Sequence, residues 1–307
     1  MAETTRRTFL ASAACAAAAT AGPLGAAPRK HVPVSTNQYP WLTFYRREGR
    51  NFNAELDAAL SEIAASGLDG LEPLVRSEAD IDRLVPLLKK HGLSMRSLYV
   101  NTVLYDQKRA PDSIENVLSI ARKARAAGTR IIVTNPSPIR WGGTADKNDT
   151  QLEVQAKALN ELGGELKKLG LTLGYHNHDS ELRKAAREFH HMLVGTDPSL
   201  VGFCLDAHWI YRGAGNSSVA LFDVVKLYGD RIVELHLRQS KGGVWTEVFG
   251  PGDIDYARLA RELRNLGIKP HLVLEQAVEA QTPKTLTALE AHKRGVKQVR
   301  RIFSIFA

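Results

Sequence analysis

Cysteine is scarce in this chain of 307 residues, in which Cys15 and Cys204 are the only two. We expect Cys15 to be removed with an N-terminal segment, so the mature chain keeps one cysteine and forms no internal disulfide. A chain of this length buries enough apolar surface to fold without covalent support. The fold therefore has to be explained by packing, and by whatever cofactor the chain binds.

Long apolar runs and clusters of basic and aromatic residues are also missing. The apolar stretch near the N-terminus is too short and too weakly hydrophobic for a stable membrane span. The net charge is +8, but no run of lysine and arginine is interleaved with aromatic residues. The basic residues are spread over helical faces and the C-terminal tail. We therefore expect a solvated basic surface and no nucleic-acid partner.

A glycine-rich phosphate loop is absent as well, which disfavours a doubly wound dinucleotide-binding sheet. Instead, eight short apolar runs alternate with about eight amphipathic stretches from residue 32 onward. Several stretches end in glycine, the residue that commonly follows a helix C-terminus. This alternation predicts an α/β chain folded as a (β/α)8 TIM barrel, with a doubly wound sheet as the alternative. The runs are VPVSTNQYPWLTF, GLDGLEPL, LSMRSLYVN, TRIIVTN, LTLGYHNH, LVGFCLD, RIVELHL and HLVLEQA, and the glycines are Gly67, Gly92, Gly128, Gly170 and Gly267.

The N-terminal segment TTRRTFLASAACAAAATAGPLGAA has paired arginines, an alanine-rich stretch and then small residues. TRRTFL resembles a twin-arginine export signal, with Arg6 and Arg7 as the pair. We expect residues 1–27 to be a signal peptide cleaved near Ala26 or Ala27, and residues 28–307 to be the barrel domain. The expected location is periplasmic or extracellular. Because this route carries folded proteins, it favours a protein that is loaded with a cofactor before export.

Polar and metal-capable side chains end most of the expected strands. In a barrel, the carboxyl ends of the strands carry the active-site groups, so these side chains should converge on one pocket. Buried carboxylates would repel one another there and would lose several kcal/mol each in hydration, unless a cation compensates. The last four expected strands therefore predict one divalent metal site. In chain order, the residues at the strand ends are Glu72, Tyr99, Asn101, Asn135, His176, His178, Asp206, His208, His236 and Glu275.

Five segments, in this order and spacing, resemble the sugar phosphate isomerase/epimerase family of xylose isomerase-like TIM barrels: GYHNHDSEL, VGFCLDAHWIYRGAG, DRIVELHLRQ, FGPGDIDY and LVLEQA. Inosose dehydratases and ketose epimerases are among its members. The resemblance implies that Asp206, His236 and Glu275 are metal ligands. Family epimerases have a glutamate where this chain has His176, so the two-glutamate epimerase mechanism does not carry over directly. We prefer Glu181 as the fourth ligand, with His176 as the alternative, and expect Mn²⁺, Co²⁺ or Zn²⁺.

The expected activity is isomerisation or epimerisation of a sugar or keto-sugar, by proton abstraction next to a carbonyl through a metal-stabilised enediolate. The alternative is a metal-dependent lyase on the same site, either a dehydratase or an enzyme that cleaves 3-keto-glycosides by β-elimination. A non-catalytic sugar-binding protein is a third hypothesis. A DNA phosphodiesterase would need more histidine ligands than the chain offers. The sequence leaves a homo-oligomer open.

Roles follow for the residues at the predicted mouth of the barrel. Glu275 combines ligand and catalytic roles, and His178 and His208 are the other catalytic candidates. For the histidines, hydrogen bonding to sugar hydroxyls without proton transfer is an equal alternative. The predicted substrate-binding residues are Glu72, Asn101, Asn135, His176, Trp209 and Arg238.

Overall fold

The computed structural model describes residues 31–307, in which eight parallel strands form one sheet. The order of the strands in the sheet is β2-β1-β10-β7-β6-β5-β4-β3. The predicted (β/α)8 TIM barrel is therefore confirmed, and the doubly wound alternative is wrong. The strands are β1 (Val34–Asn37), β2 (Gly70–Glu72), β3 (Ser97–Tyr99), β4 (Ile131–Thr134), β5 (Thr172–His176), β6 (Val201–Asp206), β7 (Ile232–Leu237) and β10 (His271–Leu274).

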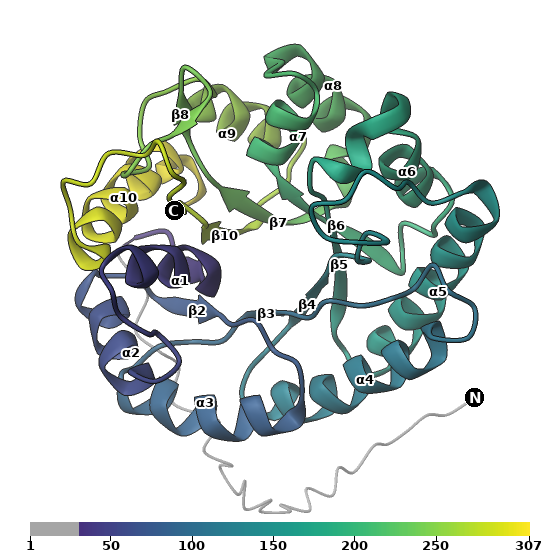
Figure 1. Cartoon of the computed structure of the whole chain (residues 1–307), viewed down its shortest axis with the longest axis horizontal. Helices are drawn as coiled ribbons and strands as arrows, with labels where there is room; N and C mark the ends of the chain where they lie inside the picture. Colours follow the sequence, from purple (N-terminus) through teal and green to yellow (C-terminus); the bar gives the residue numbers. More distant parts are fainter. Residues whose placement is uncertain (1–30) are drawn as a thin grey trace, which may run out of the picture. The chain divides into compact units, whose positions relative to one another are not determined.

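Helices connect the strands and form a ring outside them (Figure 1). A short antiparallel hairpin, β8 (Ser240–Lys241) and β9 (Val244–Trp245), follows β7. The helices are α1 (Gln38–Arg47), α2 (Leu56–Ala65), α3 (Glu78–Lys90), α4 (Ala110–Ala126), α5 (Asp149–Lys168), α6 (Arg183–Val194), α7 (Ala207–Gly213), α8 (Ser218–Tyr228), α9 (Tyr256–Asn265) and α10 (Ala288–Ile302).

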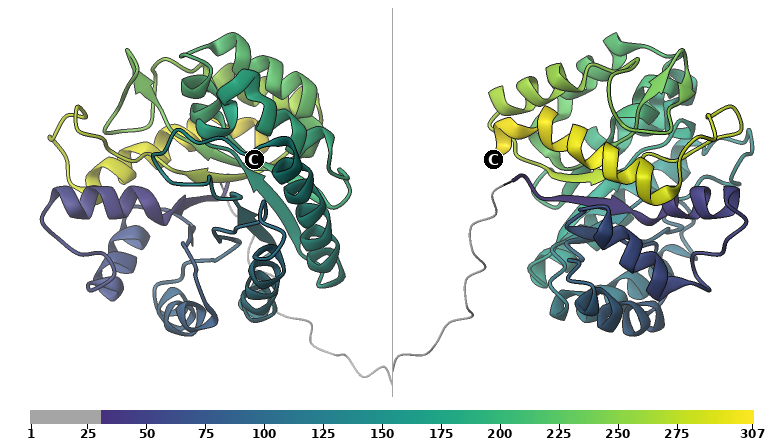
Figure 2. Two further views of the ribbon diagram at one scale, coloured as in Figure 1. Left: turned by 45° about the vertical axis from the view of Figure 1, so that its right-hand side comes forward. Right: turned by 90° about the vertical axis from the view of Figure 1, so that its left-hand side faces the viewer.

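The barrel closes where its two edge strands, β2 and β3, meet. Isolated parallel bridges join Gly70 to Ser94 and Leu74 to Tyr99 across this seam. The Tyr99 N–H donates to the carbonyl of Pro73 at 2.9 Å. On the opposite side of β2, α10 packs against α1 and α2, so the last helix lies beside the first ones (Figure 2). Early and late parts of the chain thus complete one ring.

Burial explains why these segments form strands and helices. The strands are buried on both faces, as expected for short apolar runs covered by helices. In α4, Ile114, Val117 and Ala121 recur at helical spacing and are all buried. Fully burying a valine or isoleucine side chain stabilises the folded state by about 1.5–3 kcal/mol relative to leaving it exposed. The resulting frame holds the carboxyl ends of the strands in fixed positions.

The first apolar run differs from its prediction. We expected VPVSTNQYPWLTF to be one strand, but β1 stops at Asn37 and α1 begins at Gln38. The Asn37 side chain accepts the N–H of Tyr39 and caps the helix. Pro40 lies in the first turn, where its missing N–H has no cost. The prediction that glycines terminate helices is confirmed, since Gly67, Gly92, Gly128, Gly170 and Gly267 all have positive φ.

The predicted signal peptide, residues 1–27 with Arg6 and Arg7, lies outside the described residues. Residues 31–307 form one compact unit. Within that unit, no helix combines the length and the apolar character needed to cross a membrane.

Candidate metal centre

Four neighbouring strands bring two histidines and two carboxylates together. His176 ends β5, Asp206 ends β6, His236 lies near the end of β7, and Glu275 directly follows β10. These strands are adjacent in the sheet, and Asp206 is in register with His236. Each of the four side chains offers one ligand atom, and these atoms all lie within 4.8 Å of one another. We call these four residues the metal cluster.

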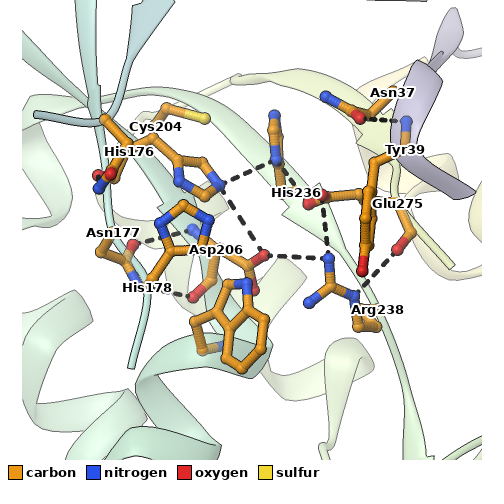
Figure 3. A network of polar contacts seen from close by, with 12 residues as sticks. Asn37, Tyr39, His176, Asn177, His178, Cys204, Asp206, His236, Arg238 and Glu275 are labelled. Atoms are coloured by element: carbon orange, nitrogen blue, oxygen red, sulfur yellow. Dashed lines mark hydrogen bonds and ion pairs between the residues drawn. The ribbon is translucent and has the colours of Figure 1, made fainter. Parts of the chain in front are cut away.

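The metal cluster is buried and its atoms face one another (Figure 3). The Nδ1 atom of His236 lies 2.8 Å from Oε2 of Glu275 and 3.2 Å from Nε2 of His176. The same His176 nitrogen is 3.9 Å from Oδ2 of Asp206. The other nitrogen of His176, Nδ1, faces the hydroxyl of Tyr99 at 3.4 Å. Each imidazole therefore presents one nitrogen to the cluster and the other to a separate polar group.

Asp206 supplies the clearest sign that this cluster fits a cation. Its Oδ1 accepts the N–H of Trp209 at the start of α7, at 2.9 Å. Its Oδ2 is buried and has no hydrogen-bond partner among the described residues. Burial raises the pKa of Asp206 to about 7, although the charge of Arg238 opposes the increase. A divalent ion would hold this carboxylate ionised, and two nitrogen and two oxygen donors suit Zn²⁺, Mn²⁺ or Co²⁺.

The far side of His236 is held by two more carboxylates. Its Nε2 atom lies 3.1 Å from Oε1 of Glu72 and 3.1 Å from Oε1 of Glu234. Both glutamates are fully buried, and Asn37 donates to Glu72 at 2.5 Å. Burial, followed by the charge of Glu72, raises the pKa of Glu234 to about 8. This arrangement favours a proton on Nε2, so that Nδ1 is free to ligate, as is common behind metal-bound histidines.

Cys204 lies beside the metal cluster and forms, with His176 and His236, another group that could hold a metal ion. Its Sγ atom donates to Oε1 of Glu234 at 3.6 Å. Burial raises the pKa of the Cys204 thiol well above its ordinary value. Because metals bind the thiolate, this environment favours the nitrogen and oxygen donors of the metal cluster over Cys204.

Glu181, our preferred fourth ligand, is placed elsewhere. Its Oε2 accepts the N–H of His178 at 2.6 Å, and its Oε1 accepts the hydroxyl of Ser180 at 2.9 Å. Asn135 also donates to Oε1, at 3.3 Å. Both carboxylate oxygens of Glu181 therefore stabilise the loop after β5. This loop turns back on itself rather than over the metal cluster. The geometry favours the alternative, His176, as the fourth ligand.

Arg238 orients Glu275 from the side opposite His236. Its Nη2 atom lies 3.0 Å from Oε1 of Glu275, and its Nε donates to the Glu275 carbonyl at 3.0 Å. The buried guanidinium also packs over the rings of Trp209 and Trp245, at 5.0 Å and 4.4 Å from their centroids. Oε1 of Glu275 thus pairs with Arg238, while Oε2 faces His236.

A cavity of about 350 Å³ opens beside the metal cluster. Of the predicted catalytic and substrate-binding residues, it brings together Asn101, His176, His178, Trp209, Arg238 and Glu275. The Nδ1 atom of His178 has no hydrogen-bond partner among residues 31–307. The ring of His178 packs between Trp141 and Trp209, with centroids 5.2 Å and 5.8 Å away. The cavity therefore has an apolar wall with a few polar groups, as is usual for small-molecule sites.

Three of the predicted catalytic and substrate-binding residues do not line this cavity. His208 was expected to share a strand face with Asp206, but the strand ends at Asp206 and His208 belongs to α7. It is buried against Trp209, Tyr211 and Trp245.

The other two have contacts that explain their positions. Glu72 lies behind His236, as described above. The Asn135 side chain donates to the His176 carbonyl at 3.0 Å and to Glu181. Both therefore support residues of the site rather than facing the cavity.

Sequence reasoning missed several supporting residues. Glu234 could have been found, because side chains alternate along a strand and place it on the face of His236. Tyr99 was noted only as a strand end, although its hydroxyl faces His176. Asn37 and Tyr39 line the cavity from the start of α1, and our strand prediction for that segment concealed them.

The comparisons with known proteins agree with this fold. A family model described as xylose isomerase-like TIM barrel matches residues 60–297. The chain belongs to this family. An inosose dehydratase from Clostridium botulinum is 22% identical over 278 residues, covering 81% of this chain and 90% of that protein.

Solved structures share the fold at low sequence identity. A sugar phosphate isomerase/epimerase from Parabacteroides distasonis superposes with a TM-score of 0.69 at 18% identity, covering 92% of this chain and 97% of that one. The IOLI protein, solved with a bound zinc atom, has a TM-score of 0.65 at 17% identity, covering 90% of this chain and 99% of that one. Family membership and the enzymatic relatives make an enzyme the expected class for this chain.

Proposed function

We propose that this chain is a divalent-metal-dependent enzyme that isomerises or epimerises a sugar or keto-sugar. The observation that carries the proposal is the metal cluster, in which four buried ligand groups meet beside a cavity. His176, Asp206, His236 and Glu275 would hold the ion. When bound, the ion would act as a Lewis acid on neighbouring substrate oxygens and make the adjacent C–H bond more acidic.

The residues of the cavity divide the remaining tasks. Glu275 lines the cavity and can accept the carbon-bound proton through Oε2. Its Oε1 is held by Arg238. His178 faces the same space and can return a proton to a neighbouring atom of the substrate. Trp141 and Trp209 provide flat surfaces for the apolar face of a sugar ring.

A lyase on the same site is the second candidate. It is favoured by His176, which stands where sugar epimerases are expected to carry a second glutamate for proton transfer. The named dehydratase relative also supports it. Abstraction of the same proton, followed by loss of a β-substituent, would give an unsaturated product.

The test combines metal analysis with an exchange experiment. Purified protein should contain about one divalent ion per chain, and metal-loaded protein in D₂O should incorporate deuterium next to the carbonyl of a keto-sugar. His178→Ala should keep the metal and lose turnover by about 10²–10⁴-fold. Product spectra separate an isomer from an unsaturated sugar. Protein that binds no metal, and whose activity Mn²⁺, Co²⁺ and Zn²⁺ fail to restore, would refute the proposal.

The cellular location is proposed on the sequence alone. The pair Arg6 and Arg7 in TRRTFL supports export by the twin-arginine route to the periplasm or the outside of the cell. A metal loaded before export would then stay with the folded barrel.

A further inference from the structure

A second cavity, of about 320 Å³, adjoins the cavity of the metal cluster. It lies over the seam between β2 and β3 and is bounded by α1, α2, α3 and α4. Leu74, Tyr99 and Asn101 line both cavities. The two cavities therefore border on each other at these three side chains.

Several polar groups of the second cavity have unused hydrogen-bonding capacity. Asn53 accepts from Gln38 through Oδ1, at 3.2 Å, which leaves its Nδ2 free to donate. Asn116 donates through Nδ2 to the carbonyl of Arg76, at 3.3 Å, which leaves its Oδ1 free to accept. The side chain of Asn101 forms no hydrogen bond with any residue of the range 31–307. Amides of this kind offer donors and acceptors together, as vicinal hydroxyl groups require.

The rest of the lining is mostly apolar but also includes Gln38, Arg76, Asp80 and Arg83, whose charges sum to a small positive charge. Leu42, Leu56 and Leu84 are among the apolar side chains. Asp80 accepts the backbone N–H of Arg76 at 2.9 Å and lies 3.8 Å from its Nε, so these two charges offset each other. Arg83 is exposed and forms no ion pair within the described part of the chain. An apolar surface bordered by amides and one guanidinium matches the two faces of a sugar ring.

We propose that the second cavity is a subsite for the second sugar ring of a glycoside whose first ring lies at the metal cluster. This inference rests on the proposed function and narrows its substrate class from free sugars to disaccharides or similar glycosides. Each cavity alone is near the lower end of the range of about 300–1,000 Å³ for ligand sites. Together they accommodate two connected rings, with the glycosidic bond passing Tyr99 and Asn101.

The test measures binding of defined sugars to the Mn²⁺-loaded protein by calorimetry. The probes are cellobiose, maltose and lactose, compared with glucose and galactose. We expect at least one disaccharide to bind about 10-fold more tightly than either monosaccharide, a difference of about 1.4 kcal/mol. Asn53→Trp, which fills the second cavity from an exposed loop, should remove this preference and leave monosaccharide binding unchanged. Arg83→Ala should reduce the preference several-fold.

Matched variants control for surface effects. Asn265→Trp places the same bulky side chain on an exposed position of α9, and Arg122→Ala removes an exposed arginine of α4 outside the cavity. Both should bind every probe like the unmodified protein. Monosaccharides that bind as tightly as all disaccharides, or an Asn53→Trp variant that weakens both classes equally, would overturn the subsite. Failure of the proposed function would appear separately, as absent metal and absent deuterium exchange.

Discussion

The carboxylates behind His236 allow a sharp prediction about metal affinity. Glu72→Gln and Glu234→Gln should each have a small effect, while the double variant should weaken metal binding about 10–100-fold, or about 1.4–2.7 kcal/mol. The reason is that the single N–H of His236 at Nε2 needs only one strong acceptor. Glu72 and Glu234 both lie 3.1 Å from it, so either can serve alone. Only the double variant leaves two weaker amide oxygens.

The stability of the metal-free protein should not fall when Glu234 is replaced by glutamine. Two fully buried carboxylates in contact cannot both ionise without repulsion, which is reflected in the raised pKa of Glu234, about 8. Replacing Glu234 by glutamine removes this conflict and preserves the shape of the side chain. Urea unfolding of the metal-free Glu234→Gln protein should therefore show equal or higher stability. A loss of affinity in the double variant would then not be explained by unfolding.

The assay is competition for Zn²⁺ with a chromophoric chelator of known affinity. Glu247→Gln is the control, because this buried glutamate contacts Arg47 and Thr285 rather than His236. It should leave the metal affinity unchanged. If one single variant lowers the metal affinity as much as the double variant does, the two acceptors are not interchangeable. If the double variant keeps full affinity, the carboxylates do not support His236 as a ligand.

Three further predictions concern the backbone, the pH dependence and export. Ala185 is exposed and has a φ of 58° inside α6, so Ala185→Gly should raise the free energy of unfolding by about 1 kcal/mol in urea titrations. His292 is buried against Trp41, and burial lowers its pKa to about 4. The unfolded chain therefore binds more protons below pH 6.5, and stability should fall by about 3 kcal/mol relative to His292→Phe between pH 6.5 and 4. Arg6→Lys combined with Arg7→Lys should block export without changing the folding of the barrel, as measured by periplasmic yield.

Each of these has a clear contrary result. Lys157→Gly, at an exposed position with ordinary helical geometry inside α5, should lower the free energy of unfolding by about 1 kcal/mol. A similar loss in Ala185→Gly would refute the argument that the positive φ of Ala185 is strained. A constant difference in stability between the unmodified protein and His292→Phe across this pH range would exclude His292 as a source of acid sensitivity. Unchanged periplasmic yield of the double lysine variant would contradict the twin-arginine interpretation.

The sequence by itself determined the barrel, because its signals are local and repeated. Apolar runs of strand length alternate with helical periodicity, and glycines such as Gly128 and Gly170 mark the helix ends through their positive φ. Three metal-cluster residues, Asp206, His236 and Glu275, were also predicted, since parallel strands bring their carboxyl ends to one face. Where one local signal was ambiguous, at VPVSTNQYPWLTF, the apolar run concealed a helix start.

Only the tertiary structure decided which side chains meet. Glu181 and His176 are five residues apart in sequence, and their spacing cannot tell which one turns toward the metal cluster. The loop after β5 uses both oxygens of Glu181 for its own N–H and hydroxyl groups, and so leaves His176 facing His236. Likewise, Glu72 and Glu234 come from distant strands and meet behind His236 because the barrel closes. Contacts of this kind depend on strand register and ring closure, which no local pattern encodes.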